Sequence, residues 1–340
     1  MKNKKIVTIG GGTGSFTLLS GLRNYQYDIT AVVTMADDGG STGKLRDELG
    51  VLPPGDIRQC LVALSDSSEE LRVLMNYRFD NGELKGHSFG NLFLSALEKI
   101  NGSFSSGVEE AIKILNVKGN VVPVSEEEMR LTIKLNNGKL LSGEKELDDN
   151  EDIRELGIYE VRLAKRVRAN KQALQAIKRA NFIIIGPGDH YGSIIPNLLV
   201  GGIKKAFKET KAKVIFVSPL TNKRGQTEGF DVYKYIKSIE KLIGKNRIDF
   251  VVYNSTKPHK AMVARYEKQE GKNSLVQCAY VDNKTYRIVE GDLLRKEKIS
   301  TPRNDALAHT RAFIRHDSNK LARAIALITE YSEYKSFTIL

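Results

Sequence analysis

The chain has 340 residues, of which 41% are hydrophobic and 28% are charged, as is usual for a soluble globular protein with a full core. No apolar run approaches the roughly 18 residues needed to cross a bilayer. The apolar part of the N-terminus, Ile6 to Ile9, is too short for a signal peptide. We therefore expect a cytoplasmic protein without a membrane partner.

The charge balance suits small anionic ligands. The net charge is +12, and a basic protein attracts nucleotides, nucleic acids or acidic surfaces. No nucleic-acid-binding motif accompanies the charge, so we do not expect a nucleic-acid partner. Cys60 and Cys278 are the two cysteines, far apart and outside any Cys-x-x-Cys pattern. This pattern predicts two buried, reduced thiols rather than a disulfide or a zinc site.

The first 35 residues predict a βαβ unit. Residues 5–9 (KIVTI) indicate a buried strand, 15–23 a helix with leucines on one side, and 28–35 a second strand. Since a strand–helix–strand crossover joins parallel strands, the sheet should begin as a parallel one.

The loop between the first strand and helix, GGGTG at 10–14, is typical of a nucleotide-binding turn. Glycines allow a phosphate to approach the backbone, and the helix N-terminus offers free amides and a positive dipole. The dinucleotide fingerprint is incomplete, because Ser15 stands at its third glycine position. A tight turn without a ligand is the alternative interpretation. The candidate ligand-binding residues of this loop are Gly11, Gly12, Thr13 and Gly14.

A second candidate loop follows the second strand, where Asp37 and Asp38 precede the run GGSTGK. One carboxylate there would suit a ribose, and two suggest a metal ion or a general base as well. The loop is not a Walker A motif, but it offers amides and side chains for a phosphate. The phosphate-binding candidates are Ser41, Thr42 and Lys44. A solvated turn with a helix cap is the alternative.

The turn LPPGD (52–56) again places a glycine and an acidic residue directly before a predicted helix. Asp56 is interpreted as the N-cap of a helix that begins at Ile57. Arg58, in the first turn of that helix, faces either an anion or water.

The middle of the chain departs from the α/β pattern. The run MRLTIKLNNGKLLSGEKEL (129–147) alternates apolar and polar positions around Asn137 and Gly138. This alternation predicts an inserted antiparallel hairpin, within about residues 118–160, at an edge of the sheet or near the site. The basic run at 162–180 predicts an exposed helix with an apolar stripe. Its stripe residues are Leu163, Val167, Leu174 and Ile177.

The α/β pattern then returns. Strands are predicted at 181–189, 212–220 and 248–255, and helices at 194–210 and 230–243. The strands are β-branched runs without polar alternation, as in sheets covered on both faces. We predict one doubly wound, Rossmann-like α/β domain over residues 1–340, with a mostly parallel sheet and the inserted hairpin.

Several motifs, taken in order, resemble those of the YvcK/CofD family. They are GGGTG (10–14), ADDGGSTGKLRDELGVLPPGDIRQCLVALS (36–65), GHSFGNL (86–92), GPG (186–188) with SIIPNLLV (193–200), and IRHD (314–317). The resemblance covers most of the chain and is closer to the YvcK-like gluconeogenesis factors than to the CofD phospholactate transferases.

The resemblance implies a bacterial, cytoplasmic protein that binds a UDP-sugar, notably UDP-N-acetylglucosamine, and is linked to cell shape, envelope synthesis and gluconeogenic carbon use. It implies no obligatory cofactor, an unidentified protein partner and association into homo-oligomers. The alternative is a CofD-like transferase of phosphorus-containing groups that uses Mg²⁺. An NAD(P) oxidoreductase is disfavoured, because the glycine fingerprint is broken and no hydride-transfer partner is evident.

The family's site residues map onto this chain motif by motif. Besides the residues of the two loops above, with Asp37 and Asp38 as the catalytic and metal-binding pair of a transferase, the resemblance assigns ligand contacts to His87, Ser88, Asn91, Gly186, Gly188, Asn254, Tyr266 and Arg315.

Local patterns support some of these roles and leave others open. His87 and Asn91 are four residues apart, on one face of a predicted helix, although a structural imidazole is the alternative. Arg315 precedes a helix predicted to start at 317 or 318, where a guanidinium suits a pyrophosphate or an ordinary salt bridge. The ring of Tyr266 is suited to stacking on a uracil base, and the alternative interpretation is a half-buried aromatic side chain without a ligand contact.

The chain also departs from the family pattern. Where relatives usually read GPGSLYTSI, it reads GPGDHYGSI. A carboxylate at Asp189 would repel a phosphate unless a metal ion or an arginine intervenes. His190 is then a metal ligand, an acid or a loop residue.

Overall fold

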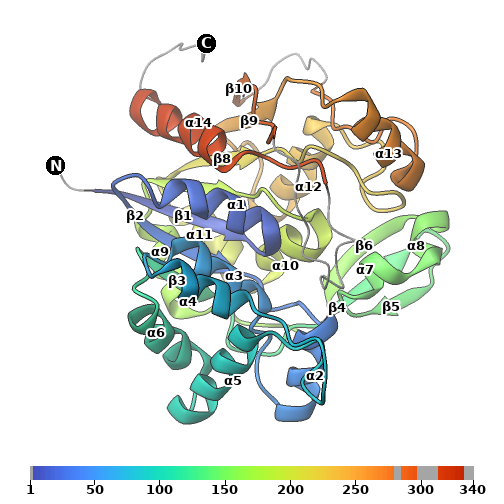
Figure 1. Ribbon diagram of the computed structural model, residues 1–340. Helices are drawn as coiled ribbons and strands as arrows, with labels where there is room; N and C mark the ends of the chain where they lie inside the picture. The colour runs from blue at the N-terminus through green and yellow to red at the C-terminus, as the bar shows by residue number, and fades with distance from the viewer. Residues whose placement is uncertain (1–2, 279–284, 297–312, 333–340) are drawn as a thin grey trace.

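The computed structural model describes residues 3–278, 285–296 and 313–332 (Figure 1). Its centre is a seven-stranded sheet in the order β10-β9-β8-β7-β1-β2-β3, in which every described pairing is parallel. The strands are β1 (Lys4–Gly10), β2 (Tyr27–Val33), β3 (Asn120–Pro123), β7 (Phe182–Ile185), β8 (Lys213–Val217), β9 (Phe250–Asn254) and β10 (Arg287–Gly291). The expected α/β fold is therefore confirmed.

The order of the strands creates a crevice at the middle of the sheet. From β1 the chain proceeds outward through β2 to β3, and from β7 it proceeds in the opposite direction through β8 and β9 to β10. Because parallel crossovers are right-handed, the two halves place their connecting helices on opposite faces. The loops after β1 and β7 consequently diverge, and such a switch point is where α/β sheets bind ligands.

Two groups of helices cover the sheet (Figure 1). In the first group α1 packs against both α3 and α14, and in the second α11 packs against both α9 and α12. The first half of the chain forms α1 (Gly12–Leu22), α2 (Gly40–Leu49), α3 (Gly55–Leu64), α4 (Glu69–Asn76), α5 (Phe89–Asn101) and α6 (Phe104–Ile114). The second half forms α9 (Lys171–Arg179), the π-helical turn η1 (His190–Ile194), α10 (Ile195–Leu199), α11 (Ile203–Glu209), α12 (Val232–Ile243), α13 (Lys260–Glu270) and α14 (Ser318–Tyr331). Among the described residues no helix is long and apolar enough to cross a bilayer.

The central strands are buried on both faces, as their composition predicts. All four residues of β7, Phe182 to Ile185, are buried, and Ile6, Val7 and Ile9 of β1 are at most 2% exposed. A β-branched side chain fits this doubly covered environment, because it packs well on a pleated surface. The rigid sheet thus holds the loops at its carboxyl edge in place.

The insertion is a three-stranded antiparallel sheet in the order β5-β4-β6, with two short helices. The elements are β4 (Leu131–Leu135), β5 (Leu140–Ser142), α7 (Glu146–Asp149), α8 (Glu151–Leu156) and β6 (Ile158–Leu163). The predicted hairpin at Asn137 and Gly138 is confirmed by the β4–β5 pairing. Leu131, Ile133 and Leu135 are fully buried and belong to the main core, so the insertion is anchored to the body of the protein.

Several predicted elements differ from the observed ones. The helix expected over 162–180 is confined to α9, because β6 uses Leu163 and Val167 is buried in the connecting loop. The helix expected over 194–210 is two helices, interrupted between Val200 and Gly202. The start of α14 at Ser318, capped by Asp317, is as predicted. Within the described part of the chain neither cysteine forms a disulfide, and Cys60 is buried whereas Cys278 is partly exposed.

Candidate functional site

A cavity of about 640 Å³ lies at the switch point of the sheet, at the carboxyl edge of its strands. Segments from most of the length of the chain contribute to its walls, from the glycine loop near the N-terminus to the turn before α14. Lining residues include Gly11, Gly12, Thr13, Gly14, Asp37, Ser41, Thr42, Lys44, Asp56, Arg58, Asn91, Glu144, Asp148, Gly188, Asp189, Lys223, Tyr266, Arg315 and His316. Loops distant in sequence thus meet at one place.

The glycine loop forms the floor of the cavity beside the N-terminus of α1. A side chain at Gly14 would place its Cβ 2.2 Å from the carbonyl oxygen of Pro187, in the loop after β7. A Cβ at Gly11 would come within 2.1 Å of a carboxylate oxygen of Asp56. Glycine is required at position 14, where the backbone of the loop after β7 is the close neighbour, whereas a side chain at position 11 would displace the Asp56 carboxylate.

Asp37 faces the cavity from the loop after β2. Its Oδ1 accepts a hydrogen bond of 3.0 Å from the amide of Gly39. Burial raises the pKa of Asp37, and the charge of Asp38 adds to the rise, while the bonds from Gly39 and the Thr42 hydroxyl act against it. Asp37 is thus a partly buried carboxyl group whose charge is poorly compensated by the protein.

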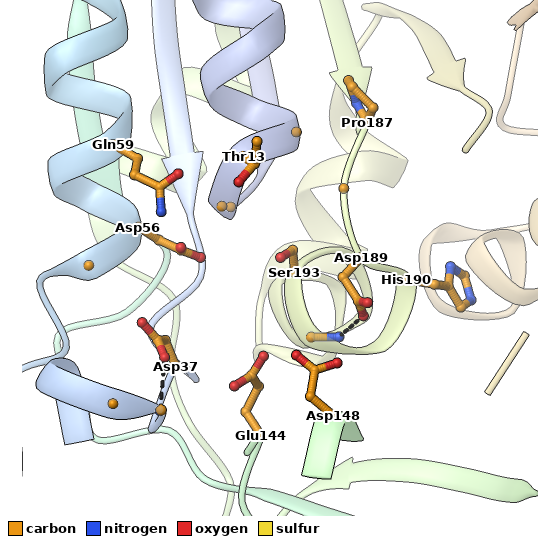
Figure 2. A pocket seen from close by; sticks show the side chains of 18 of the residues that line it. Thr13, Asp37, Asp56, Gln59, Glu144, Asp148, Pro187, Asp189, His190 and Ser193 are labelled. Atoms are coloured by element: carbon orange, nitrogen blue, oxygen red, sulfur yellow. Dashed lines mark hydrogen bonds between the residues drawn. The ribbon is translucent and has the colours of Figure 1, made fainter. Parts of the chain in front are cut away.

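Asp56 is a second buried carboxyl group at the cavity, which the sequence interpretation treated as a helix cap. Helix α3 begins at Gly55, two residues earlier than predicted, with Pro54 at its N-cap position, so the carboxyl group of Asp56 is not the cap. Asp56 turns toward the glycine loop instead, as Figure 2 shows. Burial, followed by the nearby charge of Asp37, raises its pKa to about 7, although the Gly12 amide and Arg58 oppose the rise.

Asp38 does not line the cavity, although it is adjacent to Asp37. Its Oδ1 accepts a hydrogen bond of 2.7 Å from the backbone amide of Lys145, in the insertion. Its Oδ2 lies 4.0 Å from a guanidinium nitrogen of Arg46. The two adjacent acids therefore have different surroundings, and only Asp37 is placed to meet a ligand.

The insertion adds acidic groups that sequence reasoning missed. Glu144 and Asp148 lie on the turn after β5 and on α7, and both reach toward the same space as Asp37 and Asp56 (Figure 2). Burial raises the pKa of Glu144 well above its usual range, and the charges of Asp37, Asp148, Asp189 and Asp56 raise it further. One end of the cavity is thus rich in carboxyl groups from four separate segments.

The charge of the atypical Asp189 is compensated by a lysine and a backbone amide. Its Oδ1 accepts a 2.7 Å hydrogen bond from the amide of Gly192, and its Oδ2 lies 2.6 Å from the Lys223 ammonium. Burial would raise the pKa of Asp189, but Lys223 and the Gly192 amide outweigh burial and lower it. Lys223 also lies 2.7 Å from Asp148, and these two carboxylates raise its pKa despite burial.

His190 points away from the acidic groups in Figure 2. Its Nε2 lies 2.9 Å from the Ser238 hydroxyl, and its ring packs edge-on against Tyr191, Phe230 and Tyr235. Burial lowers its pKa to about 4, with Asp189 acting in the opposite direction. His190 is thus a neutral packing residue, which favours the loop-residue interpretation over a metal ligand or acid.

The GHSFGN motif builds the wall next to α2. Nδ1 of His87 lies 3.1 Å from the Ser41 hydroxyl, and Ser88 caps α5 by accepting from the Asn91 amide at 3.2 Å. The Asn91 side chain accepts from Nε of Arg58 at 2.9 Å and lines the cavity. Since α5 starts at Phe89, His87 lies before the helix. Its contact with Ser41 packs the imidazole against the start of α2.

The other end of the cavity is more apolar. Tyr266 is 4% exposed and belongs to a small hydrophobic cluster with Ile314. Its hydroxyl accepts from Thr221 at 2.9 Å. Arg315 lines the cavity beside this cluster. His316 is buried, which lowers its pKa to about 4, and its Nε2 has no hydrogen-bond partner within the described part of the chain.

Asn254 and Gly186 lie outside the cavity lining. The Asn254 side chain donates to the Thr256 carbonyl at 2.7 Å and accepts from the Leu293 amide at 3.0 Å. It therefore joins the loops beyond β9 and β10. Gly186 begins the turn after β7, with a φ of +79° and a cis peptide bond to Pro187.

The cavity brings together two helix N-termini, several cations and several carboxyl groups. The starts of α1 and α2 carry the positive ends of helix dipoles, which attract a phosphate group. The cationic side chains that line the cavity are those of Lys44, Arg58, Arg78, Lys85, Lys145, Lys223 and Arg315. The described residues contain no cluster of three or more side chains arranged to hold a metal ion.

Comparison with known proteins identifies the family. The family model described as 2-phospho-L-lactate transferase CofD matches residues 6–294. A protein of Thermotoga maritima is 42% identical over 329 residues, covering 96% of this chain and 100% of that protein. The gluconeogenesis factor of Bacillus subtilis is 35% identical over 320 residues, covering 94% and 96%. The crystal structure of a UPF0052 family member from Bacillus halodurans superposes with a TM-score of 0.85 at 33% identity, covering 96% of this chain and 99% of the other. The chain therefore belongs to the CofD family and, within it, to the YvcK-like gluconeogenesis factors.

Proposed function

We propose that this protein binds a UDP-sugar, such as UDP-N-acetylglucosamine, at the switch-point cavity and regulates envelope synthesis, cell shape and carbon use in the bacterial cytoplasm. The observation that carries the proposal is one cavity that joins a glycine loop, several cations and an apolar end. Its volume of about 640 Å³ is within the usual range for small-molecule sites.

The pyrophosphate would lie over the starts of α1 and α2. The positive N-terminus of α1 at Gly11 to Gly14 attracts its oxygens, and Ser41 adds a hydroxyl donor. The Gly12 amide and the Thr42 hydroxyl donate to Asp56 and Asp37 in the ligand-free protein, so a phosphate would compete with these carboxylates for them. The guanidinium of Arg315 matches the geometry of a phosphate, because its donors form a fixed fork.

The uracil base would occupy the end formed by Leu220, Tyr266 and Ile314. Aromatic and aliphatic surfaces exclude water from a planar base, and a neutral His316 offers a nitrogen for a base edge. The sugar would then lie toward the carboxyl groups, which accept hydrogen bonds from its hydroxyls.

Calorimetric titration tests this proposal. We expect UDP-N-acetylglucosamine to bind the wild-type protein more tightly than GDP or NAD, and we expect Arg315→Ala to weaken binding at least tenfold, or about 1.4 kcal/mol. Arg323→Ala is the matched control, because Arg323 is exposed on α14 and does not line the cavity. Equal affinity in wild type and Arg315→Ala would remove Arg315 from the site, and no binding of any UDP-sugar would refute the proposed ligand.

A CofD-like transfer of a phosphorus-containing group is the second candidate, and the buried acids favour it. A bound Mg²⁺ would neutralise phosphate charge during transfer. Such an ion is commonly held by one or two carboxylates together with substrate phosphates, and Asp37 and Asp56 offer two neighbouring carboxyl groups at the cavity. Asp37 and Asp56 are thus better placed to hold the ion than Asp37 and Asp38, the pair expected from the sequence. A carboxyl group with a raised pKa also suits proton transfer from an acceptor hydroxyl.

Phosphorus NMR of protein incubated with nucleotide, Mg²⁺ and candidate alcohols separates the two functions. A transferase would release a nucleotide product, and Asp37→Asn would abolish the release while leaving nucleotide binding measurable. Binding without any product from the wild-type protein would support a purely regulatory role.

A further inference from the structure

The two adjacent acids of the motif ADD meet different parts of the molecule. Asp37 faces the cavity, whereas Asp38 faces the turn of the insertion that carries Glu144. Resting on the ligand site proposed above, we infer that Asp38 is a positioning residue, which fastens the turn at residues 143–148 so that Glu144 projects into the cavity.

The contact between Asp38 and the turn is short and specific. The bond from the Lys145 amide to Asp38 Oδ1 measures 2.7 Å, the usual length when a charged oxygen accepts from nitrogen. Arg46, the neighbouring cation, is 4.0 Å away and therefore makes a much weaker contact. The main role of Asp38 is thus to accept a backbone hydrogen bond from the insertion.

The backbone of the turn is shaped to receive this carboxylate. Gly143 has a φ of +111°, and a Cβ there would lie 2.4 Å from Asp38 Oδ2. Asp38 is therefore seated against the bare backbone of Gly143, which no other residue type permits. Its side chain is only 10% exposed, so this seat also excludes water from the contact.

A second attachment holds the other end of the turn. Lys223 lies 2.7 Å from Asp148 and 2.6 Å from Asp189, and Gln226 donates to the Leu147 carbonyl. Glu144 is thus held between two attachments, one to the loop after β2 and one to the loop after β8. It needs them, because the acidic residues around it repel its ionised form.

If Asp38 acts in this way, its oxygen must accept the hydrogen bond from the Lys145 amide, but its negative charge is not required. Asp38→Asn keeps a carbonyl oxygen for the Lys145 amide, whereas Asp38→Ala removes it. A residue that bound metal or ligand through its charge would instead fail in both variants.

A second pair of variants tests the donor. Lys145→Pro deletes the amide hydrogen, and the φ of −54° at this position is compatible with proline. Lys145→Ala keeps the amide and removes only the exposed side chain. This pair leaves Asp38 intact, so it still decides the question if Asp38→Ala does not fold.

Hydrogen exchange of the full-length protein, measured by mass spectrometry over residues 143–148, is the direct test. We expect at least tenfold faster exchange in Asp38→Ala, near wild-type exchange in Asp38→Asn, and faster exchange of the neighbouring amides in Lys145→Pro but not in Lys145→Ala. Asp47→Ala is the control, since Asp47 is 66% exposed and belongs to the same helix as Arg46.

Titration with UDP-N-acetylglucosamine gives the functional readout. Binding should weaken at least tenfold in Asp38→Ala and stay within threefold of wild type in Asp38→Asn. Because the Lys145 side chain itself lines the cavity, Lys145→Pro is compared with Lys145→Ala, and it should bind at least tenfold more weakly than that variant. Unchanged exchange in Asp38→Ala, or equal losses of binding in Asp38→Ala and Asp38→Asn, would overturn the inference. If the wild-type protein binds no UDP-sugar, the proposed function fails, while the exchange measurement still decides the role of Asp38.

Discussion

Asp56→Asn tests whether the buried carboxyl group beside the glycine loop reduces the stability of the ligand-free protein near neutral pH. The pKa of Asp56 is raised from 3.8 to about 7, chiefly by burial and then by Asp37. A raised pKa means that the folded state binds a proton more tightly than the unfolded state. The stability contributed by that proton is complete below about pH 4 and is lost as the pH rises to 7.

The magnitude follows from the size of the shift. Between pH 5 and pH 8 the wild-type protein should lose about 2.7 kcal/mol of stability from this group, at up to about 1.4 kcal/mol per pH unit below pH 7 and with little further loss above it. Asn does not ionise, and its side chain can still accept the hydrogen bond from Gly12. The stability of Asp56→Asn relative to wild type should therefore increase by about 2.7 kcal/mol over this range.

Urea unfolding of both proteins at pH 5, 6, 7 and 8 measures the difference, which should level off above pH 7. Asp47→Asn serves as the control, because that side chain is 66% exposed. A difference between Asp56→Asn and wild type that stays constant from pH 5 to pH 8 would show that Asp56 titrates normally and that the burial argument is wrong.

Three further changes test the surroundings of the site. Gly14→Ala places a Cβ 2.2 Å from the Pro187 carbonyl oxygen and should cost at least about 2 kcal/mol in urea unfolding, whereas Gly291→Ala, with no atom within 4 Å of its Cβ, should cost less than about 1 kcal/mol. Burial lowers the pKa of His190 to about 4, so its neutral form contributes stability that is complete above pH 6.5 and lost as the pH falls toward 4. Between pH 7 and pH 4.5 the unfolding free energy of the wild-type protein should therefore fall by about 2.5 kcal/mol more than that of His190→Gln. Equal falls in the two proteins would contradict a buried neutral ring. Asn91→Ala deletes the acceptor for the buried guanidinium on α3 and should lower the unfolding free energy by about 2 kcal/mol, which a thermal melt with unchanged midpoint would disprove.

The parallel sheet was predictable because its central strands are short, β-branched apolar runs, and two of them, β1 and β7, run into glycine turns. The glycine loop, Asp37 and Arg315 were likewise predictable as cavity residues, since they follow strand ends or precede a helix start. The extent of the basic helix was not predictable, because β6 pairs with β4 across the insertion and uses Leu163 in that pairing. Tertiary pairing overrides a local helical pattern in such a segment.

The acidic groups at the site show a different limit of sequence reasoning. A carboxylate in the first turn of a helix is usually a cap, and the direction that Asp56 takes depends on Pro54 occupying the N-cap position. Glu144 lies in a polar turn of the insertion, and only the packing of that turn against the loop after β2 brings it to the cavity. The Pro-Gly turn before Asp56 and the glycine before Glu144 are the local signals that could have pointed to them.

The place at which the insertion interrupts the chain has an evolutionary consequence. It enters after β3, an outer strand, and the chain returns to β7 at the middle, so all seven strands of the parallel sheet remain contiguous without it. Mutation can therefore remodel the turn that carries Glu144 while the scaffold that holds the glycine loop stays unchanged. Proteins with this sheet can therefore evolve different ligands and reactions through changes confined to the insertion.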